Sequence, residues 1–145
     1  MTAREYMERG YRLNIRITCD QRLLEDLQSK SASVMDGVRV QGGKLPEGRA
    51  SVLEKLIDLQ DKVNAEIDNY VDIINELRAT IEELPDSRER FVLTSRFINY
   101  DKFAQIAEAL EIDIRHVFRV YNRAMEHVTG TEGYKSHAAK HGGKK

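Results

Sequence analysis

Residues 103 to 122 read Phe103-Ala-Gln-Ile-Ala-Glu-Ala-Leu-Glu-Ile-Asp-Ile-Arg-His-Val-Phe-Arg-Val-Tyr-Asn122, and their spacing is that of a helix-turn-helix. Ala107 falls where the two helices come closest, and Asp113 is placed to cap the second helix by accepting hydrogen bonds from its first free N–H groups. Apolar residues recur where two short, steeply crossing helices share one small core, at Ile106, Leu110, Ile112, Val117 and Val120.

The second of these helices has a polar outward face. Its members are Arg115, His116, Phe118, Arg119, Asn122 and Arg123. A recognition helix lays such a face in the major groove of DNA. The alternative is an ordinary helical hairpin whose arginines are solvated. Glu111 occupies the tight turn, where glycine is usual, so the turn is either reshaped or carries about 1 kcal/mol of strain.

Charge is unevenly divided along the chain, although the formal net charge is only −1. Residues 49–89 contain eleven acidic and five basic side chains, whereas residues 90–145 contain six acidic and ten basic ones. The positive field therefore lies on and behind the proposed recognition helix, where attraction to DNA phosphates is needed.

Composition limits the class of protein. The chain has 145 residues, of which 32% are charged and 7% aromatic, a profile typical of long amphipathic helices. The single cysteine, Cys19, excludes an internal disulfide and suits a reducing cytoplasm. No apolar run reaches the roughly 20 residues needed to span a bilayer. We expect a soluble intracellular protein without a membrane partner.

A long helix is predicted over residues 51–84. Apolar residues recur there at alternating intervals of three and four, interrupted only by Gln60, at Leu53, Leu56, Val63, Ile67, Tyr70, Ile74, Leu77, Ile81 and Leu84. This is the seam of a coiled coil roughly 50 Å long. Because a helix exposing such a stripe alone is unstable in water, it needs a partner.

The N-terminal segment is the first candidate for that partner. It has one heptad frame, at Tyr6, Leu13, Ile17, Leu24, Leu27 and Val34. Residues 35–48 break the pattern with four glycines and one proline, so they are predicted to be a flexible connector. Residues 1–84 then form a helical hairpin or coiled coil, antiparallel within one chain in the simplest arrangement. A homodimer through the coiled coil is the alternative.

A second break falls at Leu84-Pro85-Asp86, where proline ends one helix and fits the first turn of the next. Residues 85–128 are predicted to form the helix-turn-helix domain, with a helix over 86–99 packing across the motif. Residues 129–145 hold four lysines against one glutamate and almost nothing apolar, so they are predicted to be a disordered basic tail. The fold class is all-α, a long N-terminal hairpin followed by a C-terminal helix-turn-helix domain.

Several short motifs lie between residues 84 and 125: Leu84-Pro-Asp-Ser-Arg-Glu-Arg90, Arg96-Phe97, Ile106-Ala-Glu-x-Leu110 and Arg115-x-Val-Phe-Arg119-x-x-x-Arg-Ala-Met125. Together they resemble region 4 of the sigma-70 transcription initiation factors, the helical domain that reads the −35 promoter element. An aromatic residue followed by arginine in the last helix is more similar to small phage and prophage regulators of Gram-positive bacteria, of the ArpU and RinA types. Those regulators also have a glycine-rich connector and a long helix ahead of the sigma-like part.

The resemblance implies a sigma-region-4-like domain that binds double-stranded DNA at promoters, with bacterial RNA polymerase as a partner and the nucleoid as its location. Two positions depart from the family, Tyr100-Asp101-Lys102 where Gly-Leu-Ser is usual, and Glu111. The segments with which sigma factors melt DNA are not recognisable. The resemblance therefore implies a regulator or accessory factor more than a complete sigma factor.

The candidate DNA contacts fall into three groups. Arg115, Arg119 and Arg123 are the main contacts, with His116 and Asn122 as candidate base readers. Phosphates are expected to meet some of Arg90, Arg96, Lys102 and the tail lysines. Phe118 points outward, toward either thymine methyl groups or a partner protein, whereas Tyr121 lies on the core stripe and is expected to pack there.

Catalytic motifs are missing from the sequence, so we expect no enzyme, no cofactor and no metal site. His137 and His141 have the i, i+4 spacing of metal ligands, but in so polar a tail they are expected to lie free in solvent. Two other functions compete. One is a phage packaging protein of the small-terminase type, which forms large rings. The other is a coiled-coil adaptor that binds only protein, and salt-dependent DNA binding separates it from a DNA-binding regulator.

Overall fold

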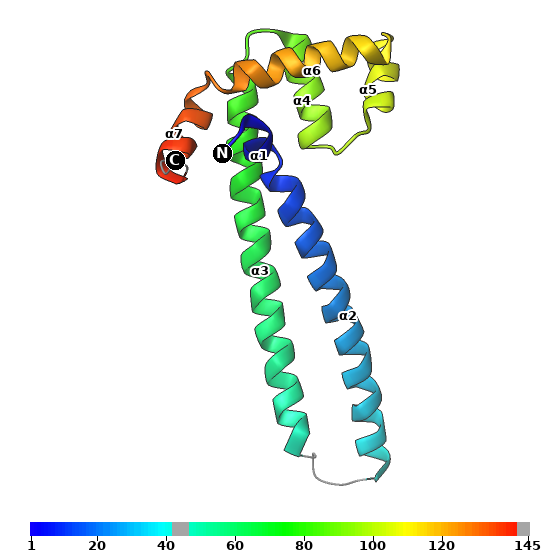
Figure 1. Cartoon of the computed structure of the whole chain (residues 1–145). Coiled ribbons are helices and arrows are strands. Elements are labelled where there is room, and N and C mark those ends of the chain that lie inside the picture. Colours follow the sequence, from blue (N-terminus) through cyan, green and yellow to red (C-terminus); the bar gives the residue numbers. More distant parts are fainter. Residues whose placement is uncertain (42–46, 142–145) are drawn as a thin grey trace. The chain divides into compact units, whose positions relative to one another are not determined.

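The structure of the chain is a computed structural model that describes residues 1–41 and 47–141, with side chains at 1–32 and 51–141. Seven helices and no strand occur in these residues, which confirms the all-α class (Figure 1). The helices are α1 (Ala3–Met7), α2 (Arg9–Gln41), α3 (Glu47–Glu82), α4 (Ser87–Phe97), α5 (Phe103–Leu110), α6 (Ile114–Val128) and α7 (Glu132–His141). None of these described helices is both long and apolar enough to cross a bilayer.

The chain divides into two compact units, and the division differs from the predicted boundary at residue 84. One unit comprises Met1–Arg12 and the chain from Tyr70 onward, and the other comprises Leu13–Asn69. Both long helices therefore contribute to both units. This division differs from the predicted one because Tyr6 and Met7 of α1 and Leu77 and Ile81 of α3 share one core cluster with α4 and α6.

The first core cluster of the larger unit joins segments far apart in the sequence. Its buried residues come from α1, α3, α4 and α6 and from the turn after α3, and they are Tyr6, Met7, Leu77, Ile81, Leu84, Leu93, Phe97, Ala124 and Val128. The hydroxyl groups of Tyr6 and Thr80 share a buried hydrogen bond of 2.7 Å. Burial raises the pKa of Tyr6 to about 12. The N-terminal helix is thus fixed to the C-terminal half of the chain.

The second core cluster lies inside the helix-turn-helix. Its buried residues are Val92, Ile106, Ala107, Val117 and Val120. Leu110 and Ile112 are partly buried and pack against them. The predicted apolar core of residues 103–122 is therefore confirmed. Figure 1 shows α6 lying across α4, with α5 beside the N-terminal end of α6.

The smaller unit is an antiparallel hairpin of parts of α2 and α3 (Figure 1). Leu13, Ile17 and Leu24 are buried on α2, and Val63 is buried on α3. Other seam positions of α3 are open to solvent, since Leu53 and Ile67 are 38% and 36% exposed. The predicted seam is therefore only partly covered among the described side chains.

The connector predicted over residues 35–48 is shorter than expected. Residues 35–41 continue α2, and Glu47 begins α3. Residues 42–46 lie outside the described part of the chain, as does the side chain of Val34. The glycine at position 37 did not end the helix, because one glycine lowers helical stability by only about 1 kcal/mol.

The tail was predicted to be disordered, and this was wrong for residues 132–141, which form α7. The helix docks through Tyr134, whose ring packs edge-on against Tyr6 and whose hydroxyl donates to the carbonyl of Met1 at 2.8 Å. The Glu83 carboxylate accepts from the backbone N–H groups of Glu132 and Gly133, at 2.8 and 3.2 Å. Residues 142–145 lie outside the described residues.

His137 was predicted to lie free in solvent, but it is half-buried. Its ring centroid lies 5.4 Å from that of Tyr6 and 4.4 Å from that of His141, and its Nδ1 lies 3.8 Å from Glu76. Burial, together with nearby Arg9, lowers the pKa of His137. The contacts of Tyr134, His137 and Glu83 together hold a segment that is polar overall.

Candidate nucleic-acid interface

The turn of the helix-turn-helix keeps the geometry of the motif without its usual glycine. Glu111 adopts the left-handed region, with φ 57° and ψ 44°. Its N–H donates to the carbonyl of Glu108 at 3.2 Å, and the N–H of Ile112 donates to that of Ala107 at 3.1 Å. The turn is therefore not reshaped. Glu111 instead adopts the left-handed conformation, which costs a non-glycine residue about 1–2 kcal/mol.

Asp113 occupies the N-cap position of α6, as predicted, but its side chain makes no capping hydrogen bond. Its backbone carbonyl instead accepts from the N–H groups of His116 and Val117, at 2.9 and 3.2 Å. The predicted side-chain cap was therefore wrong.

An exposed ridge runs along α6 on the side opposite its buried residues. Arg115, Arg119 and Asn122 form it, and all three are exposed. Among the described residues, neither arginine has a hydrogen-bond or ion-pair partner. Glu126 ends the ridge at its C-terminal side. Two of the three cations predicted as main contacts, Arg115 and Arg119, are thus available to a ligand.

One flank of the ridge meets the start of α4. His116 is half-buried, and its Nε2 lies 3.4 Å from Nη1 of Arg88. The backbone N–H of Arg88 donates to the Asp86 carboxylate at 2.8 Å, and this bond lowers the pKa of Asp86. Arg88 is an exposed cation beside the ridge. Nothing in the sequence separates it from the other charged residues of α4.

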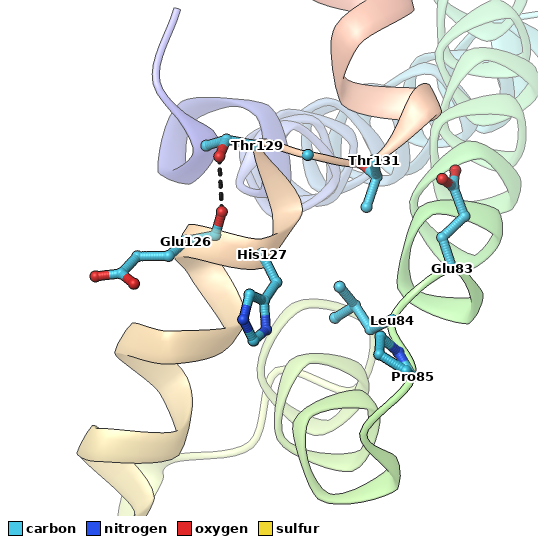
Figure 2. Close-up of a pocket in the computed structure, with 8 residues that line it drawn as sticks. Glu83, Leu84, Pro85, Glu126, His127, Thr129 and Thr131 are labelled. Carbon is cyan, nitrogen blue, oxygen red and sulfur yellow. Dashed lines mark hydrogen bonds between the residues drawn. The ribbon is translucent and has the colours of Figure 1, made fainter.

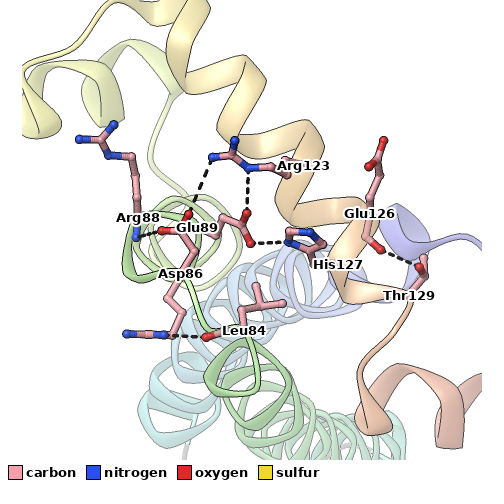
Figure 3. Close-up of polar contacts among 9 residues, drawn as sticks. Leu84, Asp86, Arg88, Glu89, Arg123, Glu126, His127 and Thr129 are labelled. Carbon is pink, nitrogen blue, oxygen red and sulfur yellow. Dashed lines mark hydrogen bonds and ion pairs between the residues drawn. The ribbon is translucent and has the colours of Figure 1, made fainter.

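Arg123, predicted as a DNA contact, is held by an internal network on this same flank (Figure 3). Its Nε donates to Glu89 at 3.0 Å, and Nδ1 of His127 lies 2.8 Å from the other oxygen of that carboxylate. Glu89 is 1% exposed. A buried carboxylate needs such partners, because an unpaired buried charge is strongly destabilising. Arg123 therefore stabilises the fold, although 53% of its side chain remains exposed.

Aromatic rings line the other flank of the ridge. Phe118 is 42% exposed and packs edge-on against Phe103, with ring centroids 4.9 Å apart. Tyr121 is half-buried between Phe97 and Phe103, which confirms its predicted packing role. Burial raises the pKa of Tyr121. Phe118 is thus partly supported from within the domain.

The three cations predicted to meet phosphates differ in their availability. Arg90 donates through Nη1 to the carbonyl of Leu84 at 2.6 Å, beyond the end of α3. Arg96 donates to the carbonyl of Asp101 at 3.1 Å and lies over the ring of Phe103, at 4.3 Å. Lys102 is exposed at the N-cap of α5. Lys102 is therefore the most accessible of the three.

The C-terminal end of α6 borders a shallow pocket of about 400 Å³ (Figure 2). Its lining includes the acidic residues Glu83 and Glu126 together with His127. Carboxylates repel phosphate, so this end limits the cationic surface. Within residues 1–41 and 47–141, no three His, Cys, Asp or Glu side chains gather as metal ligands.

The described residues define an all-α protein that contains a helix-turn-helix with an exposed basic ridge. The chain belongs to the family described as "Protein of unknown function (DUF1492)", whose model matches residues 29–129. No curated protein and no solved structure matches the chain. The matched range contains α3 to α6 and leaves out α1 and α7.

Proposed function

We propose that this protein is a sequence-specific, double-stranded DNA-binding regulator of phage type that acts at promoters in the nucleoid of a bacterial cell. One observation carries the proposal. Arg115 and Arg119 project from the first two turns of a helix whose opposite face is buried in the helix-turn-helix core, and neither has a partner among the described residues. An arginine so placed reaches guanine in the major groove, where a bidentate contact contributes about 1–3 kcal/mol of discrimination.

The remaining site residues take graded roles in the proposal. Asn122 continues the ridge and suits adenine, while His116 lies at its edge. Lys102 and Arg88 supply phosphate contacts. Arg123, Arg90 and Arg96 have intramolecular partners and contribute mainly by holding the domain together.

The proposal is tested with the full-length chain and a duplex selected from a random library. Arg115→Ala and Arg119→Ala are expected to weaken binding to the selected duplex by about 5- to 150-fold, the factor that 1–3 kcal/mol represents, and to weaken binding to a scrambled duplex less. Arg22→Ala is the control, because Arg22 is exposed on the hairpin unit. Equal losses on both duplexes would reduce the two arginines to phosphate contacts. No binding by the wild-type chain would leave the protein-binding adaptor as the function.

RNA polymerase as the partner rests on the sequence resemblance to sigma region 4. Mapping bound DNA across the host genome, with polymerase mapped in parallel, tests this part of the proposal. Coincident peaks at promoters are expected. Binding at a single phage locus, together with a ring-sized oligomer in solution, would favour a packaging protein instead.

A further inference from the structure

A groove runs beside the recognition ridge, between α1 and the start of α5. It consists of two adjoining pockets of about 380 and 200 Å³. Both are lined by Arg4, Glu8, Arg96 and Phe97. Lys102 lines the larger pocket, and Phe118 and Asn122 line the smaller. The groove is therefore continuous from the N-cap of α5 to the ridge of α6.

Cations predominate in this groove. Arg4, Arg96 and Lys102 face a single carboxylate, that of Glu8. Nε of Arg4 lies 2.7 Å from Glu8, yet 73% of the Arg4 side chain is exposed. Glu8 is also shared with Arg12, at 3.2 Å, so its charge is divided between two arginines. The groove therefore attracts anions, and both Arg4 and Lys102 are exposed in it.

The helix that carries Arg4 is held firmly against the helix-turn-helix. Tyr6 and Met7, from the same helix, are fully buried in the first core cluster with Ala124 and Val128 of α6. Thr2 and Glu5 form a reciprocal capping box at its start. Arg4 is consequently held beside the recognition helix by packing.

A helix that enters the major groove has a sugar–phosphate backbone on each side, because the groove is only about 12 Å wide. Arg88 is exposed on the α4 flank of the ridge, and Arg4 with Lys102 on the α1 flank. We propose that Arg4, together with Lys102, binds the phosphates of one DNA strand along the α1 flank of α6. This inference rests on the proposed DNA-binding function. It assigns a role to α1, which lies outside the family-matched residues 29–129.

The test compares Arg4→Ala with Arg12→Ala in the full-length chain. Both arginines pair with Glu8, and Arg12 is 65% exposed but does not line the groove. Arg4→Ala is expected to weaken binding to the selected and the scrambled duplex by similar factors. It is also expected to make the negative slope of log K against log salt shallower by about 0.9, the value for one phosphate contact. Arg12→Ala is expected to leave that slope unchanged.

Glu8→Gln supplies an independent readout, because it removes the carboxylate that competes with DNA for Arg4. Tighter binding with unchanged sequence preference is expected. If the wild-type chain binds the selected duplex but Arg4→Ala keeps the wild-type slope and affinity, the α1 flank does not contact DNA and only this inference fails. If Arg4→Ala loses sequence preference, Arg4 reads bases and the phosphate assignment is wrong. If the wild-type chain binds no duplex, the proposed function fails as well.

Discussion

The part of α3 in the larger unit and the part in the hairpin unit carry the same apolar repeat but bury it to different extents. Leu77 and Ile81, in the larger unit, are 0% and 2% exposed. Leu53 and Ile67, in the hairpin unit, occupy equivalent positions of the repeat and are more than one-third exposed. The three–four spacing thus indicates which face of a helix is apolar. It does not indicate how much of that face a partner covers.

The difference follows from what each end of the helix contacts. Leu77 and Ile81 meet side chains from α1, α4 and α6 in the first core cluster. The hairpin unit has only two helices, which bury the seam residue Val63 but leave Leu53 and Ile67 partly open to solvent. A second copy of the chain could cover these exposed apolar residues, as in the homodimer given as the alternative in the sequence analysis.

Replacing one leucine in each unit tests this difference. Leu77→Ala is expected to lower the free energy of unfolding by about 2–5 kcal/mol, because it leaves a cavity in a closed core. Leu53→Ala is expected to lower it by less than about 1 kcal/mol. Urea unfolding followed by circular dichroism measures both. Equal losses would mean that Leu53 is covered in solution, and a melting temperature that rises with protein concentration would identify the cover as a second copy.

The docking of α7 is a finer test of how tightly the larger unit is packed. A Cβ at Gly133 would overlap the Thr80 hydroxyl and lie 3.2 Å from the Tyr6 hydroxyl, and those two groups are hydrogen-bonded and buried. Gly133→Ala is expected to cost about 1–3 kcal/mol of docking free energy. Hydrogen exchange of residues 132–141 measures it.

Gly130→Ala is the matched control, because its added Cβ meets only the His127 carbonyl oxygen, at an ordinary 3.5 Å. A change within about 0.5 kcal/mol is expected there. Unchanged protection of α7 in Gly133→Ala would mean that the helix is not docked against Thr80. It would favour the prediction that residues 129–145 are disordered.

Acidification is expected to weaken the docking of α7 in the larger unit and to stabilise the hairpin unit. Both effects are expected to be smaller than those of the substitutions above. The pKa of His137 is lowered below 6.5 by burial and by Arg9, with His141 and Lys140 adding to this and Glu76 opposing it. The undocked tail therefore binds protons more readily, so docking is fully present above pH 6.5 and weakens as the pH falls from there. His137→Gln is expected to remove this dependence.

In the hairpin unit, the pKa of Glu66 is raised above 4.5 by burial and by Asp20, against the opposing charges of Lys62 and Arg16. The folded hairpin then binds the proton more readily than the unfolded one. Its stability therefore increases as the pH falls through the folded pKa toward 4.5. Glu66→Gln is expected to abolish this gain. Hydrogen-exchange protection factors, corrected for intrinsic rates, follow both units in one experiment, and parallel slopes would contradict the assignment.

Local sequence determined the parts of this protein that depend on neighbours along the chain. Helical periodicity predicted the core of residues 103–122 and the outward direction of Arg115 and Arg119, because residues three and four apart share one face of a helix. Pro85 marked the break between α3 and α4, since proline lacks the N–H that continues a helix. These features need no knowledge of what lies opposite.

Tertiary structure alone decided which faces meet. The bond between Tyr6 and Thr80 joins residues 74 apart, and that between Arg123 and Glu89 joins residues 34 apart. No periodic pattern encodes such pairs, so the sequence predicted neither the pairing of Arg123 with Glu89 nor the helix over residues 132–141. Burial accounts for both features. Glu89 is desolvated and therefore needs cationic partners, and α7 packs through Tyr134 against the buried ring of Tyr6. The position of Arg4 beside α6 arises in the same way, from the packing of its neighbours Tyr6 and Met7.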